Sequence, residues 1–158
     1  AARAFEANTE QFLRNMYRTD QWLEDETGMS GMTIVQTATD TNPPGKLCMS
    51  EEELAVFVAG FEQSGFEYPI CWYRNFDRNW KLLGEVDDAV REKVTVPVLM
   101  IHGTYDMVPA NPELEKVVEN LEVHTLDCGH WIMDEMPAET NQAILAWLDR
   151  SGAESVAV

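Results

Sequence analysis

The sequence predicts an α/β fold whose first part is helical and whose last part contributes two neighbouring strands of a parallel sheet. Residues 94–103, VTVPVLMIHG, form a continuous apolar run rich in β-branched residues, which is typical of a strand buried on both faces. The residues before this run show helical periodicity, and a second short strand and a terminal helix follow it. We therefore divide the chain into a helical region, 1–91, and an α/β region, 92–158.

The chain begins with an amphipathic helical segment, which a loop follows. Residues 1–26 have the periodicity of one helix or two, with an apolar stripe along one side. The stripe consists of Phe5, Phe12, Leu13 and Met16. Residues 27–49 are rich in Gly, Thr, Pro and Met, and this composition indicates a loop.

The rest of the helical region carries clear start and stop signals. Ser50 and Glu53 have the spacing of a capping box, and Gly65 is suited to end a helix, so we expect a helix over 51–63. Aromatic residues then recur at helical spacing, at Trp72, Phe76 and Trp80. Apart from its loop, this region is expected to be wholly helical.

The α/β region is predicted to run in the order strand, helix, strand, loop, helix. Residues 111–121 form a surface helix with Pro112 in its first turn, and residues 122–127 form the second strand. Residues 136–152 form the terminal helix. Two strands do not make a stable parallel sheet, because each needs neighbours for its hydrogen bonds and its faces. The remaining strands are expected to lie in another segment.

Composition and charge exclude several classes of partner. The chain has 28 acidic and 11 basic residues, and its formal charge of −17 repels phosphate backbones and anionic membrane surfaces, so nucleic acid and membranes are not expected partners. No apolar run reaches the roughly 18 residues of a membrane span. The three cysteines, Cys48, Cys71 and Cys128, lack Cys-x-x-Cys spacing, which suits a reducing compartment, and we expect a cytoplasmic protein. The sequence is also compatible with a homo-oligomer.

Two polar residues follow the two predicted strands. Asp106 lies just after Gly103, and His130 lies in the loop after the second strand. Ligands and catalytic side chains collect at the carboxyl ends of parallel strands, so we expect these residues to meet. A carboxylate that accepts a hydrogen bond from one imidazole nitrogen supports the charge that forms when the other nitrogen takes a proton. Considered alone, Asp106 would also be explained as a turn residue at the end of a strand. Considered alone, His130 would also be explained as a histidine with a purely structural role.

Three segments carry a family resemblance that covers essentially the whole chain. VPVLMIHGTYDMVP and DCGHWIMDEMPAETNQAILAWL together resemble the C-terminal part of the α/β-hydrolase superfamily. GFEYPICWYRNFDRNW is similar to the cap of soluble-type epoxide hydrolases and is the more specific of the motifs. The resemblance implies a helical cap followed by the last two parallel strands and flanking helices of an α/β-hydrolase fold.

The resemblance also implies a reaction and the residues that perform it. In that family an aspartate nucleophile opens the epoxide to an ester, two cap tyrosines donate hydrogen bonds to the epoxide oxygen, and a His–Asp pair activates water against the ester. By match, Tyr73 resembles one of the tyrosines, Asp106 the acid and His130 the base. The expected substrate is a small apolar epoxide, and the expected chemistry needs no metal or organic cofactor. The implied substrate-binding residues are Trp72, Met107 and Trp131.

Several parts of the family pattern are missing from this sequence. It contains no Gly-x-Asp-x-Gly nucleophile turn and no His-Gly-x-Pro loop upstream of the cap. The second tyrosine is also absent, because Tyr17, Tyr68 and Tyr105 do not match its place. The first helical pattern has no N-cap before it. We therefore expect the chain to be the second half of an enzyme whose N-terminal half is its partner, and a truncation, a nicked product or a split enzyme would each give this sequence.

The same residues also allow other functional interpretations. The residues His124, Asp127, Cys128 and His130 are crowded together but lack zinc-ligand spacing, so a metal site is not expected. Haloalkane dehalogenases share the Asp nucleophile and His base but have no use for a tyrosine that protonates oxygen, and Tyr73 therefore favours epoxides. Another α/β-hydrolase, such as an esterase, and a non-catalytic binding module remain as alternatives.

Overall fold

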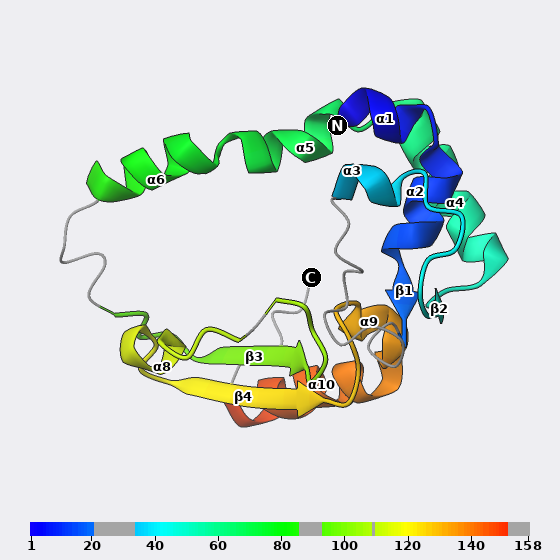
Figure 1. The fold of residues 1–158 in the computed structure, drawn as a ribbon. Helices are drawn as coiled ribbons and strands as arrows, with labels where there is room; N and C mark the ends of the chain where they lie inside the picture. The colour runs from blue at the N-terminus through cyan, green and yellow to red at the C-terminus, as the bar shows by residue number, and fades with distance from the viewer. Residues whose placement is uncertain (21–33, 86–92, 109, 152–158) are drawn as a thin grey trace. The chain divides into compact units, whose positions relative to one another are not determined.

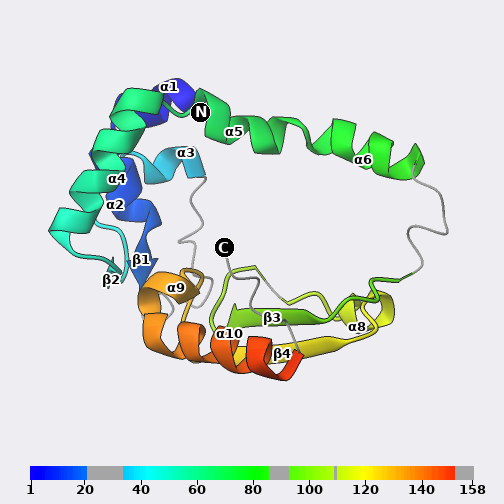
Figure 2. The same cartoon turned by 180° about the vertical axis from the view of Figure 1, so that it is seen from behind.

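The computed structural model describes residues 1–20, 34–85, 93–108 and 110–151 (Figure 1; Figure 2). The chain divides into two compact units, Ala1–Asp88 and Ala89–Val158, and each is described by itself. Among the described helices, none has both the length and the apolar character that crossing a membrane requires.

The first unit is mainly helical. Its helices are α1 (Ala2–Glu6), α2 (Thr9–Met16), α3 (Ile34–Thr37), α4 (Glu51–Ser64), α5 (Glu67–Arg74) and α6 (Phe76–Glu85). Its strands are β1 (Arg18–Thr19) and β2 (Lys46–Leu47). Helices α2 and α4 pack against one another, and this contact organises the unit.

An aromatic cluster forms the core of the first unit. The rings of Phe5 and Phe12 stack with their centroids 4.0 Å apart, and Phe66 meets both rings edge-on at 5.5 and 5.3 Å. Leu13 and Leu54 are each 2% exposed beside them. The predicted stripe of the first helical segment thus faces the core, and its fourth member, Met16, packs against the same cluster.

The predicted capping box of α4 is confirmed. The Glu53 N–H donates to Ser50 Oγ (3.2 Å), and the Ser50 N–H donates to Glu53 Oε2 (2.8 Å). At the other end Gly65 takes a φ of 68°, in the left-handed region that glycine enters without strain. The helix therefore begins where the sequence predicts and ends one residue later.

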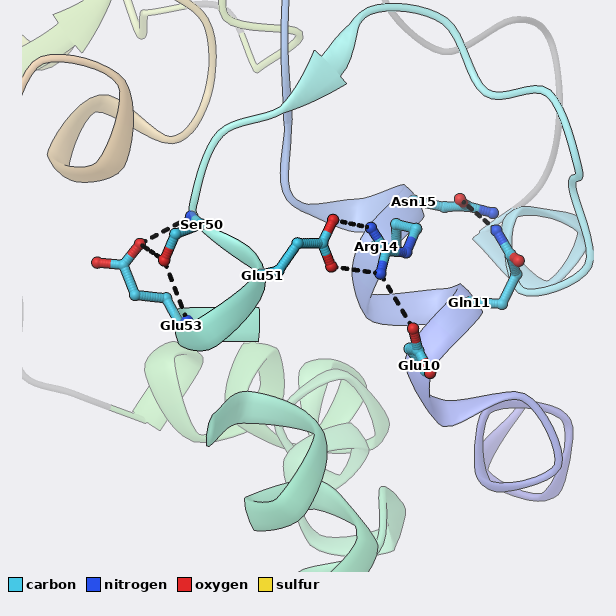
Figure 3. A network of polar contacts seen from close by, with 7 residues as sticks. All are labelled: Glu10, Gln11, Arg14, Asn15, Ser50, Glu51 and Glu53. Carbon is cyan, nitrogen blue, oxygen red and sulfur yellow. Dashed lines mark hydrogen bonds and ion pairs between the residues drawn. The ribbon is translucent and has the colours of Figure 1, made fainter. Parts of the chain in front are cut away.

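Arg14 ties α2 to the start of α4 (Figure 3). Its guanidinium donates to both carboxylate oxygens of Glu51, each at 2.7 Å, and to Glu10 at 3.0 Å. On the neighbouring side of α2, the buried Asn15 amide donates to the carbonyls of Thr37 and Asp40, at 2.7 and 2.8 Å. These contacts fix both α4 and the 37–40 segment against α2.

The expectation of a wholly helical first region is wrong. β1 and β2 form an antiparallel pair with Arg18 opposite Leu47 and Thr19 opposite Lys46. The Arg18 guanidinium donates to the carbonyls of Pro43, Pro44 and Gly45, which holds the returning chain alongside β1. Helix α2 accordingly ends at Met16 instead of continuing, and the end of the predicted helix, residues 21–26, lies outside the described residues.

The predicted loop and the aromatic segment also differ in detail from the structure. Within the described part of the 27–49 loop, one turn of helix, α3, forms over Ile34–Thr37. The aromatic segment folds as two helices, α5 and α6, with Asn75 between them. Its aromatic side chains are largely exposed, with Trp72 at 69% and Trp80 at 78%.

The second unit is built on a two-stranded parallel sheet. Its strands are β3 (Val98–Gly103) and β4 (Leu121–Leu126), and its helices are α8 (Leu114–Val117), α9 (Ile132–Glu135) and α10 (Pro137–Ser151). The register runs from Val98 opposite Leu121 to Gly103 opposite Leu126, so both strands end at the same level. Helix α10 lies along the sheet in Figures 1 and 2 and contacts both strands.

Three predicted boundaries in this unit need correction. β3 begins at Val98 instead of Val94, because Pro97 interrupts the ladder, although Val94 still forms a single parallel bridge with Val118. That bridge draws Val118 into an extended conformation (φ −111°, ψ 116°), which ends the predicted 111–121 helix after one turn. β4 then starts at Leu121.

The loop after β4 contains a short helix, α9, that was not predicted from the sequence. The terminal helix is confirmed from Pro137 to Ser151, while Gly152 lies outside the described residues.

Candidate active site

Asp106 and His130 lie in the loops that follow β3 and β4. Because these strands are parallel neighbours and end in register, the two loops leave the sheet side by side. His130 Nδ1 stands 2.8 Å from Asp106 Oδ1. The structure therefore brings together the two residues that the sequence placed at the strand ends.

Main-chain hydrogen bonds join the two loops. The Thr104 N–H donates to the Leu126 carbonyl at 2.8 Å, and the Tyr105 N–H donates to the Cys128 carbonyl at 3.0 Å. Thr104 Oγ1 adds a second bond to the Leu126 carbonyl at 3.0 Å. Hydrogen bonding of the β3–β4 ladder thus continues almost to Asp106, which restricts how far that residue can move relative to His130.

Gly103 allows the two loops to approach this closely. A Cβ atom at position 103 would stand 2.2 Å from the Gly129 carbonyl oxygen and 2.5 Å from that of Cys128, well inside contact distance. Both obstacles are main-chain atoms, which cannot swing aside as a side chain can. From the sequence, Gly103 was predicted only to end the strand. Its role in leaving room for the close approach of the two loops was not predicted.

Asp106 is oriented by the backbone of its own loop. Its Oδ1 accepts the Val108 N–H at 2.8 Å as well as facing His130. The Asp106 side chain is 15% exposed and that of His130 is 39% exposed, so the acid is the more enclosed partner. With the Nδ1 proton directed to the carboxylate, Nε2 carries the lone pair that can accept a proton.

Glu135 reaches back from α9 to the main chain around His130. Its carboxylate accepts the N–H of Gly129 at 2.9 Å and the N–H of Trp131 at 3.0 Å. Glu135 was not among the predicted site residues. Asp127 and Asp134 are carboxylates in the same stretch, so the sequence did not single out Glu135.

Cys128 is a buried thiol next to the site. It is 2% exposed, and burial, together with the charges of Glu135, Asp127 and Asp106, raises the pKa of its thiol to about 11. A thiol with so high a pKa is a poor nucleophile at neutral pH. Its environment fits a packing role.

The remaining predicted site residues fall into two groups. Met107, 40% exposed, follows Asp106, and the Trp131 ring lies edge-on to that of His130 with the centroids 5.0 Å apart. Tyr73 and Trp72 are on α5 in the first unit, where Tyr73 is 64% exposed and lies 5.6 Å from the Phe76 ring. The second unit alone therefore brings together Asp106, Met107, His130 and Trp131.

The crowded residues at 124–130 do not form a cluster of metal ligands. In the ranges that the structure describes, no three His, Cys, Asp or Glu side chains converge as ion ligands would. His130 is instead engaged by Asp106.

The chain is similar in sequence to known epoxide hydrolases. No family model matches the sequence. The chain is 35% identical over 150 residues to bifunctional epoxide hydrolase 2 of Rattus norvegicus, covering 90% of this chain and 26% of that protein. It is 35% identical over 105 residues to epoxide hydrolase A of Mycobacterium tuberculosis, covering 63% of this chain and 32% of the relative.

Solved structures of epoxide hydrolases also resemble this chain. An epoxide hydrolase from an endophytic Streptomyces matches 94% of this chain and 48% of its own length, with a TM-score of 0.77 and 28% identity. Potato epoxide hydrolase I matches 65% of this chain and 35% of its own, with a TM-score of 0.58 and 30% identity.

The described units therefore form part of an α/β-hydrolase fold, as the sequence predicted. Within that fold, the homologues of this chain are epoxide hydrolases. The chain spans about a quarter to a third of the curated relatives and up to about half of the solved structures.

Proposed function

We propose that this chain forms part of an epoxide hydrolase, which adds water to an epoxide to give a vicinal diol. The observation that carries the proposal is the 2.8 Å contact between His130 Nδ1 and Asp106 at the ends of adjacent parallel strands. The same chain has epoxide hydrolases as its homologues. An acid–base pair at this edge of an α/β sheet is suited to activate water.

In the proposed first step, a carboxylate nucleophile attacks one carbon of the epoxide. A new C–O bond forms the ester, the epoxide C–O bond breaks, and the oxygen that leaves takes a proton from Tyr73. A phenol suits this role because its reference pKa of about 10 keeps it protonated at neutral pH. Tyr73 is exposed on α5, which leaves its hydroxyl accessible to a substrate.

In the proposed second step, His130 takes a proton from water at Nε2 while Asp106 supports the resulting positive charge. The water oxygen attacks the ester carbonyl, the ester C–O bond breaks, and the diol oxygen leaves with a proton returned by His130. The nucleophile leaves the ester as a carboxylic acid, and its proton passes through solvent to the Tyr73 phenolate. Both groups are then regenerated, and the sum is epoxide plus water giving diol. No step calls for a metal or an organic cofactor.

We further propose that the nucleophile comes from an N-terminal half that this chain does not contain. The sequence has no Gly-x-Asp-x-Gly turn, and the chain covers less than half of the solved structures that it matches. Exposed apolar side chains on both units support this proposal, because a folded enzyme normally covers such side chains with another part of the protein. These include Tyr68, Trp72 and Trp80 in the first unit and Val123, Met133 and Leu145 in the second.

Product analysis of the complete enzyme tests this function. This chain, combined with its nucleophile-bearing half, is expected to convert an aryl or alkyl epoxide to the vicinal diol. A haloalkane and an ester of matched size serve as control substrates. Turnover of either control with the epoxide untouched would show that the reaction class is wrong. A stable, monodisperse 17.9 kDa monomer that needs no second half would favour a binding module instead.

A further inference from the structure

One carboxylate holds the main chain on both sides of His130. Glu135 Oε2 accepts the Gly129 N–H at 2.9 Å, and Glu135 Oε1 accepts the Trp131 N–H at 3.0 Å. Each oxygen therefore binds one of the two amides that flank the candidate base. Charged acceptors form the stronger class of hydrogen bond with main-chain amides, so this arrangement restrains both peptide planes at once.

Ordinary helix capping explains only half of this arrangement. Trp131 is the N-cap residue of α9, and a carboxylate within the helix commonly accepts the N-cap N–H. The second bond goes beyond the helix, to the peptide N–H of Gly129 on the far side of His130. The carboxylate thus spans the histidine.

Other contacts keep Glu135 and the loop in place. Thr140, which is 3% exposed on α10, donates from Oγ1 to the Ile132 carbonyl at 3.1 Å and so anchors α9 to the terminal helix. On the opposite side, the Gly129 carbonyl lies against Gly103, with no room for a side chain between them. The His130 loop is therefore held from α9 and α10 on one side and from β3 on the other.

The charge of Glu135 also acts on this loop. After burial, the Glu135 carboxylate is the largest of the causes that raise the pKa of the Cys128 thiol.

We propose that Glu135 is a positioning residue for His130, which fixes the loop so that Nδ1 meets Asp106 and Nε2 is presented to water. This role rests on the proposed function, because the step that it serves is the hydrolysis of the ester. Ring opening depends on the nucleophile and on Tyr73, so Glu135 is expected to affect the second step and to leave the first unchanged.

Glu135→Gln in the complete enzyme separates the two steps. The substitution keeps the shape but replaces one acceptor oxygen with an NH₂ group, which cannot accept an amide proton. Glu139→Gln is the matched control, because it removes the same charge from an exposed position on α10. Rapid-quench mass spectrometry measures the rates at which the covalent ester forms and decays on a single turnover with an aryl epoxide.

The expected result is at least a tenfold slower decay of the ester in Glu135→Gln, with its formation within about twofold of wild type and Glu139→Gln unchanged. Equal slowing of formation and decay would indicate a merely structural role and overturn the proposal. Wild-type decay in Glu135→Gln would also overturn it. Glu135→Asp, which keeps the charge but is one methylene shorter, is expected to decay at an intermediate rate, and it replaces Glu135→Gln if that variant does not fold.

A spectroscopic signal tests the positioning independently of turnover. The proton shared between His130 Nδ1 and Asp106 should give a low-field ¹H NMR resonance in wild type and in Glu139→Gln. That resonance should be lost or broadened in Glu135→Gln. If wild type lacks epoxide turnover but shows this pattern, the proposed function fails and the positioning stands. An unchanged resonance in Glu135→Gln contradicts the positioning itself.

Discussion

Replacing Gly103 with alanine should disrupt both the stability of the second unit and the candidate site. The new Cβ would stand 2.2 Å from the Gly129 carbonyl oxygen, and contacts below 3.0 Å are essentially never seen, so that oxygen must retreat by about 0.8 Å. The Cys128 carbonyl must retreat by about 0.5 Å, which weakens its bond from the Tyr105 N–H. Overpacking costs about 1–3 kcal/mol and a lost hydrogen bond about 1 kcal/mol, so we expect a loss of about 2–4 kcal/mol.

Thermal unfolding of the complete enzyme measures this loss, with Gly60→Ala as the matched control. Gly60 lies within α4 with nothing inside 4 Å of its would-be Cβ, so alanine there should stabilise the helix by about 0.5–1 kcal/mol. Gly103→Ala should lower the midpoint by on the order of 10 °C. A Gly103→Ala variant as stable and active as wild type would refute the close approach of the two loops.

Three further predictions concern other parts of the chain. Ser50→Ala removes the acceptor of the Glu53 N–H and should lower stability by about 1 kcal/mol, measured by thermal unfolding; no change would contradict the observed cap. The Arg14 guanidinium lowers the pKa of Glu51 from its usual value of 4.5. Their ion pair should therefore stabilise the fold fully above about pH 4.5, and this stabilisation should be lost as the pH falls through the lowered pKa. The stability difference between wild type and Arg14→Met should therefore shrink in acid, and a difference independent of pH would argue against the pair. Because the pKa of Cys128 is about 11, an alkylating reagent at about pH 8 should modify that thiol only after unfolding, and rapid labelling of the native protein, seen by peptide mass, would disprove its burial.

Local signals in the sequence predicted the elements whose ends depend on a few neighbouring residues. The capping box at Ser50 and Glu53 and the final Gly65 fixed α4 to within one residue, because each end is satisfied by bonds within four residues of it. Elements that depend on distant partners were missed. β1 forms because the Arg18 guanidinium binds carbonyls some 25 residues away, and the 111–121 helix is cut short because Val118 pairs with Val94.

The candidate site shows the same division. The order of strands and loops was enough to predict that Asp106 and His130 would meet, because parallel neighbours bring their carboxyl ends together. The roles of Gly103 and Glu135 depend on how closely two loops approach and on where one carboxylate turns. Neither the packing distance nor the side-chain direction leaves a periodic pattern in the sequence.

The covalent intermediate offers the most direct measurement of the proposed mechanism. His130→Gln in the complete enzyme should form the ester but fail to hydrolyse it, so intact mass spectrometry after incubation with an epoxide should show the protein plus one epoxide. Tyr73→Phe should slow ring opening and accumulate no adduct. Loss of activity in both variants without any adduct would contradict the assignment of His130 to ester hydrolysis and point to a structural role for that residue.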